Sequence, residues 1–137
     1  MRKIKFALAA LALVALCHVT VAQKNSCTYF TVQGLTTDAC AGDYRTFQVI
    51  TDICTESMSV VASSSNSNDV AGVINYSIDP VNRKTTWNIG LSVAEYTGTP
   101  HTVKTFLRTI TLTFTYECCD VIYTQTRTIN AYECPLR

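Results

Sequence analysis

The sequence predicts an all-β protein, folded as a single antiparallel β-sandwich with three disulfides and preceded by a cleaved signal peptide. Three observations support this prediction. Residues 105–120 alternate polar and apolar side chains, which is the period of a half-buried strand and not of a helix. Shorter β-rich segments recur at intervals of about ten residues, with turn residues between them. Six of the seven cysteines follow a typical export leader, where cysteines usually form disulfides.

Residues 1–22 have the three parts of a signal peptide. A basic start at residues 2–5 is followed by an apolar run at residues 6–16, which is too short to span a bilayer. Residues 20–22, Thr-Val-Ala, place small side chains at the positions that signal peptidase reads. Cleavage after this triplet leaves residues 23–137 as one secreted β-sandwich domain, with an expected extracellular location.

The charge balance excludes several classes of partner. The chain has 11 Lys and Arg residues against 10 Asp and Glu residues, and part of the basic charge belongs to the leader. The mature chain therefore has no basic patch for nucleic acid. It also has no second apolar stretch long enough to cross a membrane, so we expect no membrane association after signal cleavage. The expected partners are an extracellular protein or glycan, or a second copy of the chain that associates through an edge strand.

The mature chain keeps an even number of cysteines, because Cys17 leaves with the signal peptide. An even number in an exported domain predicts three disulfides, and six cysteines allow fifteen pairings. The six are Cys27, Cys40, Cys54, Cys118, Cys119 and Cys134.

Alternation along the strand limits two of these pairings. Cys118 belongs to the apolar face and Cys119 to the opposite one, so they should bond to different partners. We expect Cys118 to cross the core to Cys54. A vicinal bond between Cys118 and Cys119 is the strained alternative. We expect Cys119 to tie down a terminal segment through one of Cys27, Cys40 and Cys134.

The first half of the mature chain predicts three short strands, at residues 27–35, 45–53 and 57–62, each rich in residues that favour strands. Residues 34–42 contain glycine, threonine and aspartate and are predicted to form a loop. Residues 63–69, SSSNSND, predict a mobile polar loop and not a domain linker, because neither flank is long enough to fold alone.

The second half predicts four strands and no helix. Residues 70–79 and 85–93 form the clearest hairpin, closed by a turn that contains proline and asparagine. Trp87, in the second of these strands, is the first residue we assign to the core. Residues 105–120 form the longest strand, and residues 121–132 form the last.

Three segments resemble the later strands of immunoglobulin-like and cadherin-like extracellular repeats. They are residues 72–80, GVINYSIDP, residues 86–89, TWNI, and residues 110–115, ITLTFT. The resemblance implies adhesion, assembly or recognition at a cell surface, and not catalysis. The paired acidic residues of the cadherin calcium motifs are absent, so calcium binding is not implied. The Cys-Trp-Cys spacing of immunoglobulin domains is absent as well.

No catalytic residue and no metal-binding set stands out. The mature chain has one histidine, His101, in a turn, so a serine or cysteine nucleophile would have no other imidazole as its base. The cysteines lack a Cys-x-x-Cys pair, and we expect neither a metal nor another cofactor. The acidic residues are scattered, mostly at turns. A small hydrolase that uses carboxylates such as Glu117 and Asp120 is therefore the third hypothesis, behind two non-enzymatic ones.

Asn75 is a candidate glycosylation site. Asn75, Tyr76 and Ser77 form an N-glycosylation sequon. The alternation of this strand places Asn75 on the face opposite Ile74 and Tyr76. A glycan there would project from that face.

Threonines supply the candidate binding face. If the last two strands pair around Cys119 and Asp120, three threonine pairs lie opposite each other on one face. The same register turns Gln125 and Arg127 towards the core, so either the last strand is a partly covered edge or the register is shifted. Such a face suits a flat ligand, a partner sheet or O-glycans, but threonine also favours half-exposed strands in general. Its residues are Thr109, Thr111, Thr113, Thr115, Thr124, Thr126 and Thr128.

These features predict a non-enzymatic secreted structural, adhesion, matrix or coat component. It would act through its β-sheet surface or through an edge strand. The alternative is a secreted ligand-binding or inhibitor module with a carbohydrate or protein ligand.

Overall fold

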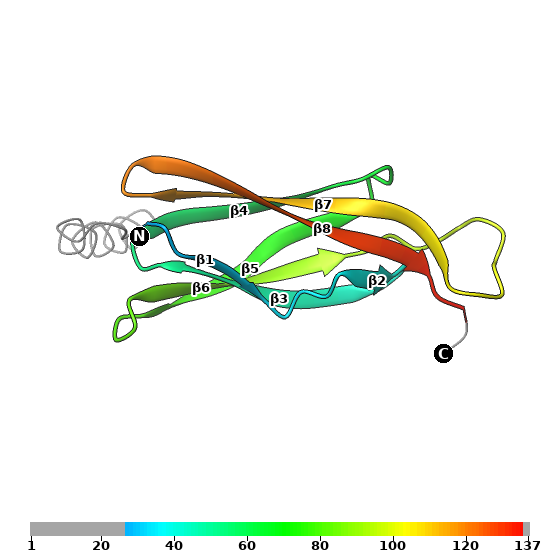
Figure 1. The fold of residues 1–137 in the computed structure, drawn as a ribbon, viewed down its shortest axis with the longest axis horizontal. Coiled ribbons are helices and arrows are strands. Elements are labelled where there is room, and N and C mark those ends of the chain that lie inside the picture. The colour runs from blue at the N-terminus through cyan, green and yellow to red at the C-terminus, as the bar shows by residue number, and fades with distance from the viewer. Residues whose placement is uncertain (1–26, 136–137) are drawn as a thin grey trace, which may run out of the picture.

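The computed structural model describes residues 27–135, which form two four-stranded sheets and no helix (Figure 1). The predicted signal peptide, residues 1–22, lies outside the described residues. No helix within residues 27–135 is long and apolar enough to cross a membrane. The strands are β1 (Phe30–Gln33), β2 (Asp38–Cys40), β3 (Tyr44–Asp52), β4 (Thr55–Ser63), β5 (Val70–Asp79), β6 (Lys84–Ser92), β7 (Thr105–Cys118) and β8 (Val121–Glu133).

The two sheets lie face to face, with their strands along the long axis of the molecule (Figure 1). Sheet A has the order β1-β3-β6-β5, and all its neighbours are antiparallel. Sheet B has the order β2-β8-β7-β4, in which β4, β7 and β8 are antiparallel. An all-β fold of two sheets is therefore confirmed.

One strand pair departs from the predicted antiparallel arrangement. β2 lies within residues 34–42, which the sequence predicts to be a loop, and it pairs with β8 in parallel. Its three residues are too few to show a period of two, so the pattern could not reveal it. Gly34 and Gly42, both with positive φ, stand on either side of it and allow the chain to change direction.

The core lies between the sheets and is built from the inward faces of both. On β7 the predicted inward residues are all buried: Ile110, Leu112, Phe114, Tyr116 and Cys118. On β6, Trp87 is buried as predicted, and its indole N–H donates to the Thr51 hydroxyl at 2.9 Å. This bond satisfies the one polar group of the indole inside an apolar environment.

The β7–β8 hairpin has the register predicted from the sequence. Thr111 pairs with Thr128, Thr113 with Thr126 and Thr115 with Thr124. The turn consists of Cys119 and Asp120, with φ of 52° and 67°. Two positive φ values are what a tight turn needs if its twist is to match that of the strands.

A bulge in β5 overturns one detail of the predicted hairpin. The register between β5 and β6 shifts between Val73 and Asn75. Tyr76 pairs with the buried Trp87 and their rings lie 5.0 Å apart, so Tyr76 is on the inner face. Ile74 was predicted to share that face, but the extra residue turns it to the outer one, where it approaches Gly90.

The predicted mobile loop is more constrained than its composition suggests. The side chain of Asp69 is fully buried and accepts hydrogen bonds from Arg108 Nε and Nη2, both at 2.6 Å. It also accepts from the Ser64 hydroxyl at 2.5 Å and from the Ala94 N–H at 2.7 Å. These bonds join the end of the loop to β7 and to the segment after β6.

Two disulfides link described residues, and their pairing corrects the prediction. Cys27 bonds to Cys118 and Cys40 bonds to Cys134. The expected bond between Cys118 and Cys54 is wrong, although both side chains are buried in one cluster together with Cys27. The pleat gives the face of Cys118, but it does not decide which of two nearby sulfurs is its partner.

The expected partners of Cys119 are also wrong. Within residues 27–135 its thiol is free, since Cys27, Cys40 and Cys134 are all bonded elsewhere, and the vicinal bond does not form. Cys119 is the first residue of the turn after β7, and it is partly buried against the cluster that contains Cys27 and Cys118, so alternation does not direct it away from the core.

Candidate binding faces

The seven predicted threonines lie together on the outer face of sheet B, and we call them the threonine face. β7 supplies Thr109, Thr111, Thr113 and Thr115, and β8 supplies Thr124, Thr126 and Thr128. On β7 these residues alternate with the core residues, so the buried side chains hold the outward ones in place. The register is thus confirmed, and the binding role stays a prediction.

A third strand extends this face. Ser59 lies opposite Thr115, Val61 opposite Thr113, and Ser63 opposite Thr111. The sequence prediction missed this column, although serine and apolar residues alternate at residues 57–62. Three rows of three side chains therefore cross β4, β7 and β8.

The nine side chains of these rows carry no charge. They are six threonines of β7 and β8 and, on β4, two serines and one valine: Ser59, Val61, Ser63, Thr111, Thr113, Thr115, Thr124, Thr126 and Thr128. Threonine and valine are branched at Cβ and have few rotamers to lose when a partner covers them. A surface of this kind costs less to desolvate and to order than one of lysine and glutamate.

The face ends at an acidic corner beside the β7–β8 turn. Carboxylate oxygens of Glu56, Glu117 and Asp120 all lie within 4.8 Å of one another. The sequence prediction treated these acids as scattered, and a bulge between Thr55 and Ser57 brings Glu56 to the other two. Burial, followed by repulsion from Glu117 and Asp120, raises the pKa of Glu56.

Replacing Glu56 by glutamine is expected to stabilise the protein at pH 7, by about 0.5 kcal/mol. Because the folded-state pKa is raised, the ionised form of Glu56 is destabilising, and this penalty disappears as the pH falls below 4.5. Urea unfolding at pH 7 and at pH 3.5 measures the effect. The gain should be present at the higher pH and absent at the lower. An equal gain for the exposed control Glu95→Gln would contradict this origin.

The inner side of β8 explains the two polar residues that the predicted register turned inward. Gln125 pairs with Phe114 and Arg127 pairs with Leu112. β2 covers β8 only at residues 130–132, so both side chains lie at a partly covered edge. The Arg127 guanidinium stands 5.2 Å over the Phe30 ring. The first of the two alternatives, a partly covered edge strand, is therefore correct.

His101, the one histidine of the predicted mature chain, is paired with the carboxylate of Glu133. Its Nδ1 lies 2.5 Å from Glu133 Oε1, and its backbone N–H donates to the same oxygen at 2.9 Å. This arrangement fixes the loop before β7 to the end of β8. Among residues 27–135, the hydrogen-bond partner of His101 is Glu133, and no serine or cysteine is bonded to its ring.

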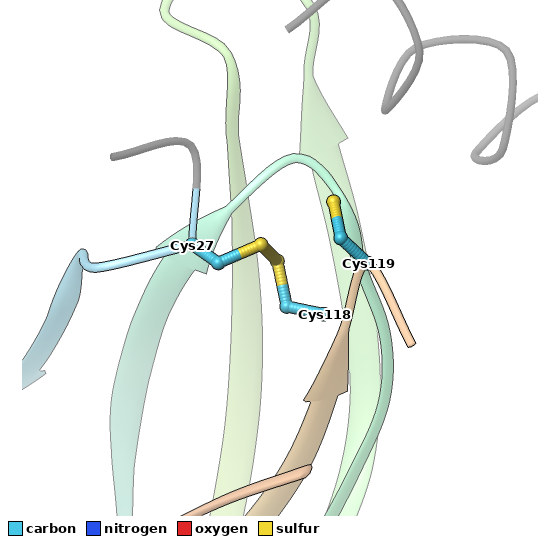
Figure 2. Close-up of side chains that lie close together, drawn as sticks. All are labelled: Cys27, Cys118 and Cys119. Atoms are coloured by element: carbon cyan, nitrogen blue, oxygen red, sulfur yellow. A yellow bond between two sulfur atoms is a disulfide. The ribbon is translucent and has the colours of Figure 1, made fainter. Parts of the chain in front are cut away.

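Three cysteine sulfur atoms lie close together beside the β7–β8 turn, at the same end of the molecule as the acidic corner (Figure 2). Those of Cys27, Cys118 and Cys119 lie within 4.8 Å of one another. Figure 2 shows the bond between Cys27 and Cys118, with Cys119 on the adjacent turn residue. A thiolate is the form that binds metal, and two of these sulfurs are consumed by the disulfide.

Asn75 occupies the outer face of sheet A, on the opposite side of the sandwich from the threonine face. It is exposed, and its Oδ1 accepts a hydrogen bond from Asn88 Nδ2 at 2.5 Å. The side chains of Asn75 and Tyr76 are on opposite faces of sheet A, as predicted. Its use as a glycosylation site stays a prediction.

Comparison of the chain with models of known protein families, and with curated proteins, finds no match. The candidate binding surfaces of the described residues are therefore the outer faces of the two sheets.

Proposed function

We propose that this protein is a secreted, non-enzymatic structural or adhesion component that assembles through the threonine face and the adjoining β4 edge. The observation that carries this proposal is the uncharged, three-strand surface of threonine, serine and valine. A large sheet face without charges, built from side chains that lose little entropy on contact, favours a broad, flat partner such as a second sheet.

The strand order supports the proposed relationship to adhesion domains. The order β1-β3-β6-β5 opposite β8-β7-β4 corresponds to strands A-B-E-D opposite G-F-C in constant-type immunoglobulin domains. Two features of this chain differ from immunoglobulin domains. The disulfide between the sheets of an immunoglobulin domain joins strands B and F, whereas the bonds here are Cys27–Cys118 and Cys40–Cys134. The core tryptophan of an immunoglobulin domain is on strand C, whereas Trp87 is on the strand equivalent to E.

Export is supported by the oxidised cysteines. The disulfides Cys27–Cys118 and Cys40–Cys134 join segments more than 90 residues apart, with separations of 91 and 94. Such bonds persist in extracellular surroundings and are rare in a reducing cytosol.

The β4 edge provides a route for assembly. β4 is the last strand of sheet B. Its charged residue, Glu56, lies at the bulge at one end of the strand, and residues 57–63 contain no charged residue and no proline. Charged side chains, proline and bulges usually prevent edge-to-edge pairing, so residues 57–63 are the part of the edge that is open to it. Val61, the seventh of the nine residues of β4, is 59% exposed. Pairing of two β4 strands would join two sheets B and double the area of the threonine face.

The substitution Val61→Lys is expected to weaken self-association at least tenfold, because it places a charge on the uncharged part of the β4 edge and in the middle row of the threonine face. Sedimentation velocity and light scattering over a range of protein concentrations measure the association. Val81→Lys is the matched control, since Val81 is 86% exposed in the β5–β6 turn, away from sheet B. This control variant should self-associate as strongly as the wild type. A wild-type protein that stays monomeric at every concentration would refute assembly through this edge.

A further inference from the structure

The outer face of sheet A carries a row of four amide side chains. Gln33 lies opposite Gln48, Gln48 opposite Asn88, and Asn88 opposite Asn75, so the row crosses all four strands. Gln48 Nε2 donates to Asn88 Oδ1 at 3.1 Å, and Asn88 Nδ2 donates to Asn75. Each amide has two donor hydrogens and an oxygen acceptor, so the row keeps free capacity on its solvent side.

A trough of about 310 Å³ lies over the middle of this row. Its lining comes from the end of β1 and from β3 and β6, and none of its residues is charged: Gln33, Gly34, Thr46, Phe47, Gln48 and Asn88. This volume is at the lower limit of small-molecule sites. The absence of a cation in the lining disfavours a phosphate or carboxylate ligand, which would call for arginine or lysine.

An exposed aromatic ring lies next to the trough. Tyr44 is 64% exposed and is two residues before Thr46 on the same face of β3, a separation of roughly 7 Å along the strand. Its ring lies across Gly90, where an added Cβ would come within 2.5 Å of the Tyr44 hydroxyl oxygen. Ile74 approaches the same glycine through its Cδ1. The absence of a side chain at residue 90 therefore leaves room for the hydroxyl end of the Tyr44 ring over β6.

We propose that this face binds an uncharged oligosaccharide. Sugar rings present paired hydroxyl groups, which planar amides can bind as donor and acceptor together, and apolar C–H faces, which pack on an aromatic ring. Gln33, Gln48 and Asn88 bind the hydroxyl groups, and Tyr44 packs against the next sugar along the strand. This site is independent of the threonine face, which is on the opposite side of the sandwich.

The proposed ligand is an external saccharide and not the glycan predicted at Asn75. The trough begins at Asn88 on β6, next to β5, and extends over β3 and the end of β1, which are two and three strands away from β5, a distance of roughly 10–14 Å. The substitution Ser77→Ala removes the sequon and leaves all four amides in place. It is therefore the background for the experiment.

The test is titration calorimetry of the mature chain with cellohexaose, hexa-N-acetylchitohexaose and laminarihexaose, with a heparin hexasaccharide as the charged comparison. At least one of the three uncharged hexasaccharides should bind, and heparin should not. Tyr44→Ala and Gln48→Ala should each weaken binding about tenfold. Tyr44→Phe keeps the ring and should stay within about threefold of the parent.

Thr113→Ala, on the threonine face, is the control and should bind like the parent. Thermal melts followed by circular dichroism check that each variant is folded. If Tyr44→Ala does not fold, the binding of Gln48→Ala tests the proposal. The proposal is overturned if none of the uncharged hexasaccharides binds. It is also overturned if heparin alone binds, or if folded Gln48→Ala binds as tightly as the parent.

Discussion

Replacing Asp69 by asparagine is expected to lower the free energy of unfolding by about 3–5 kcal/mol. The Asp69 side chain is fully buried, and Arg108 beside it is 9% exposed. The substitution leaves the guanidinium buried without its counter-charge. It also replaces one of the two carboxylate oxygens, Oδ1 bound by the Ala94 N–H or Oδ2 bound by the Ser64 hydroxyl, with an amide donor. Guanidinium denaturation at pH 7 measures the loss.

Two further variants establish the cause. Asp38→Asn disrupts an exposed pair, Asp38–Lys104 at 3.6 Å, and should cost less than about 1 kcal/mol. The double variant Asp69→Asn with Arg108→Met should recover part of the loss, since no buried charge is left uncompensated. A loss at Asp69 as small as that at Asp38 would contradict the role assigned to the buried pair.

The same pair predicts an acid limit to stability. Burial by itself raises the pKa of Asp69, but hydrogen bonds from Arg108, Ser64 and Ala94 outweigh it and hold that pKa below 3.8. A lowered folded-state pKa contributes stability that is complete above the unfolded value and is lost as the pH falls through the folded value. The difference between wild type and Asp69→Asn should therefore be constant from pH 7 to about pH 5 and should shrink below pH 3.8.

Removing the disulfide between Cys40 and Cys134 is expected to cost about 3–4 kcal/mol. The two cysteines are 94 positions apart, but the Cys27–Cys118 bond already joins their segments, so the Cys40–Cys134 bond closes a loop of about 30 residues in the unfolded chain. In the folded state it holds β2, which is joined to β8 by only three residue pairs. The variant Cys40→Ala with Cys134→Ala, unfolded in urea without reductant, measures the contribution.

Cys119→Ala is the matched control, because it removes a cysteine without removing a bond between described residues. It should change the free energy of unfolding by less than about 1 kcal/mol. If the double variant were no less stable than this control, the bond would have no role in holding the β2 edge.

The sequence correctly predicted the features that depend on alternation along a strand. The inward residues of β7 and the three threonine pairs across the hairpin appear as predicted. Both follow from the pleat, which is a property of neighbouring residues, and from a turn of two residues that sets the register. The bulge at Ile74 shows the limit, since one extra residue reverses a face without leaving a pattern.

By itself, then, the sequence determined an all-β chain with one apolar and one hydroxyl-rich face on its longest hairpin. The tertiary structure alone decided which cysteines bond, that β2 joins β8, that Asp69 meets Arg108, and that four amides align across sheet A. The reason is distance along the chain. Side-chain alternation is encoded by adjacent residues, whereas these contacts join residues as many as 94 positions apart, and their partners are chosen only when the two sheets pack.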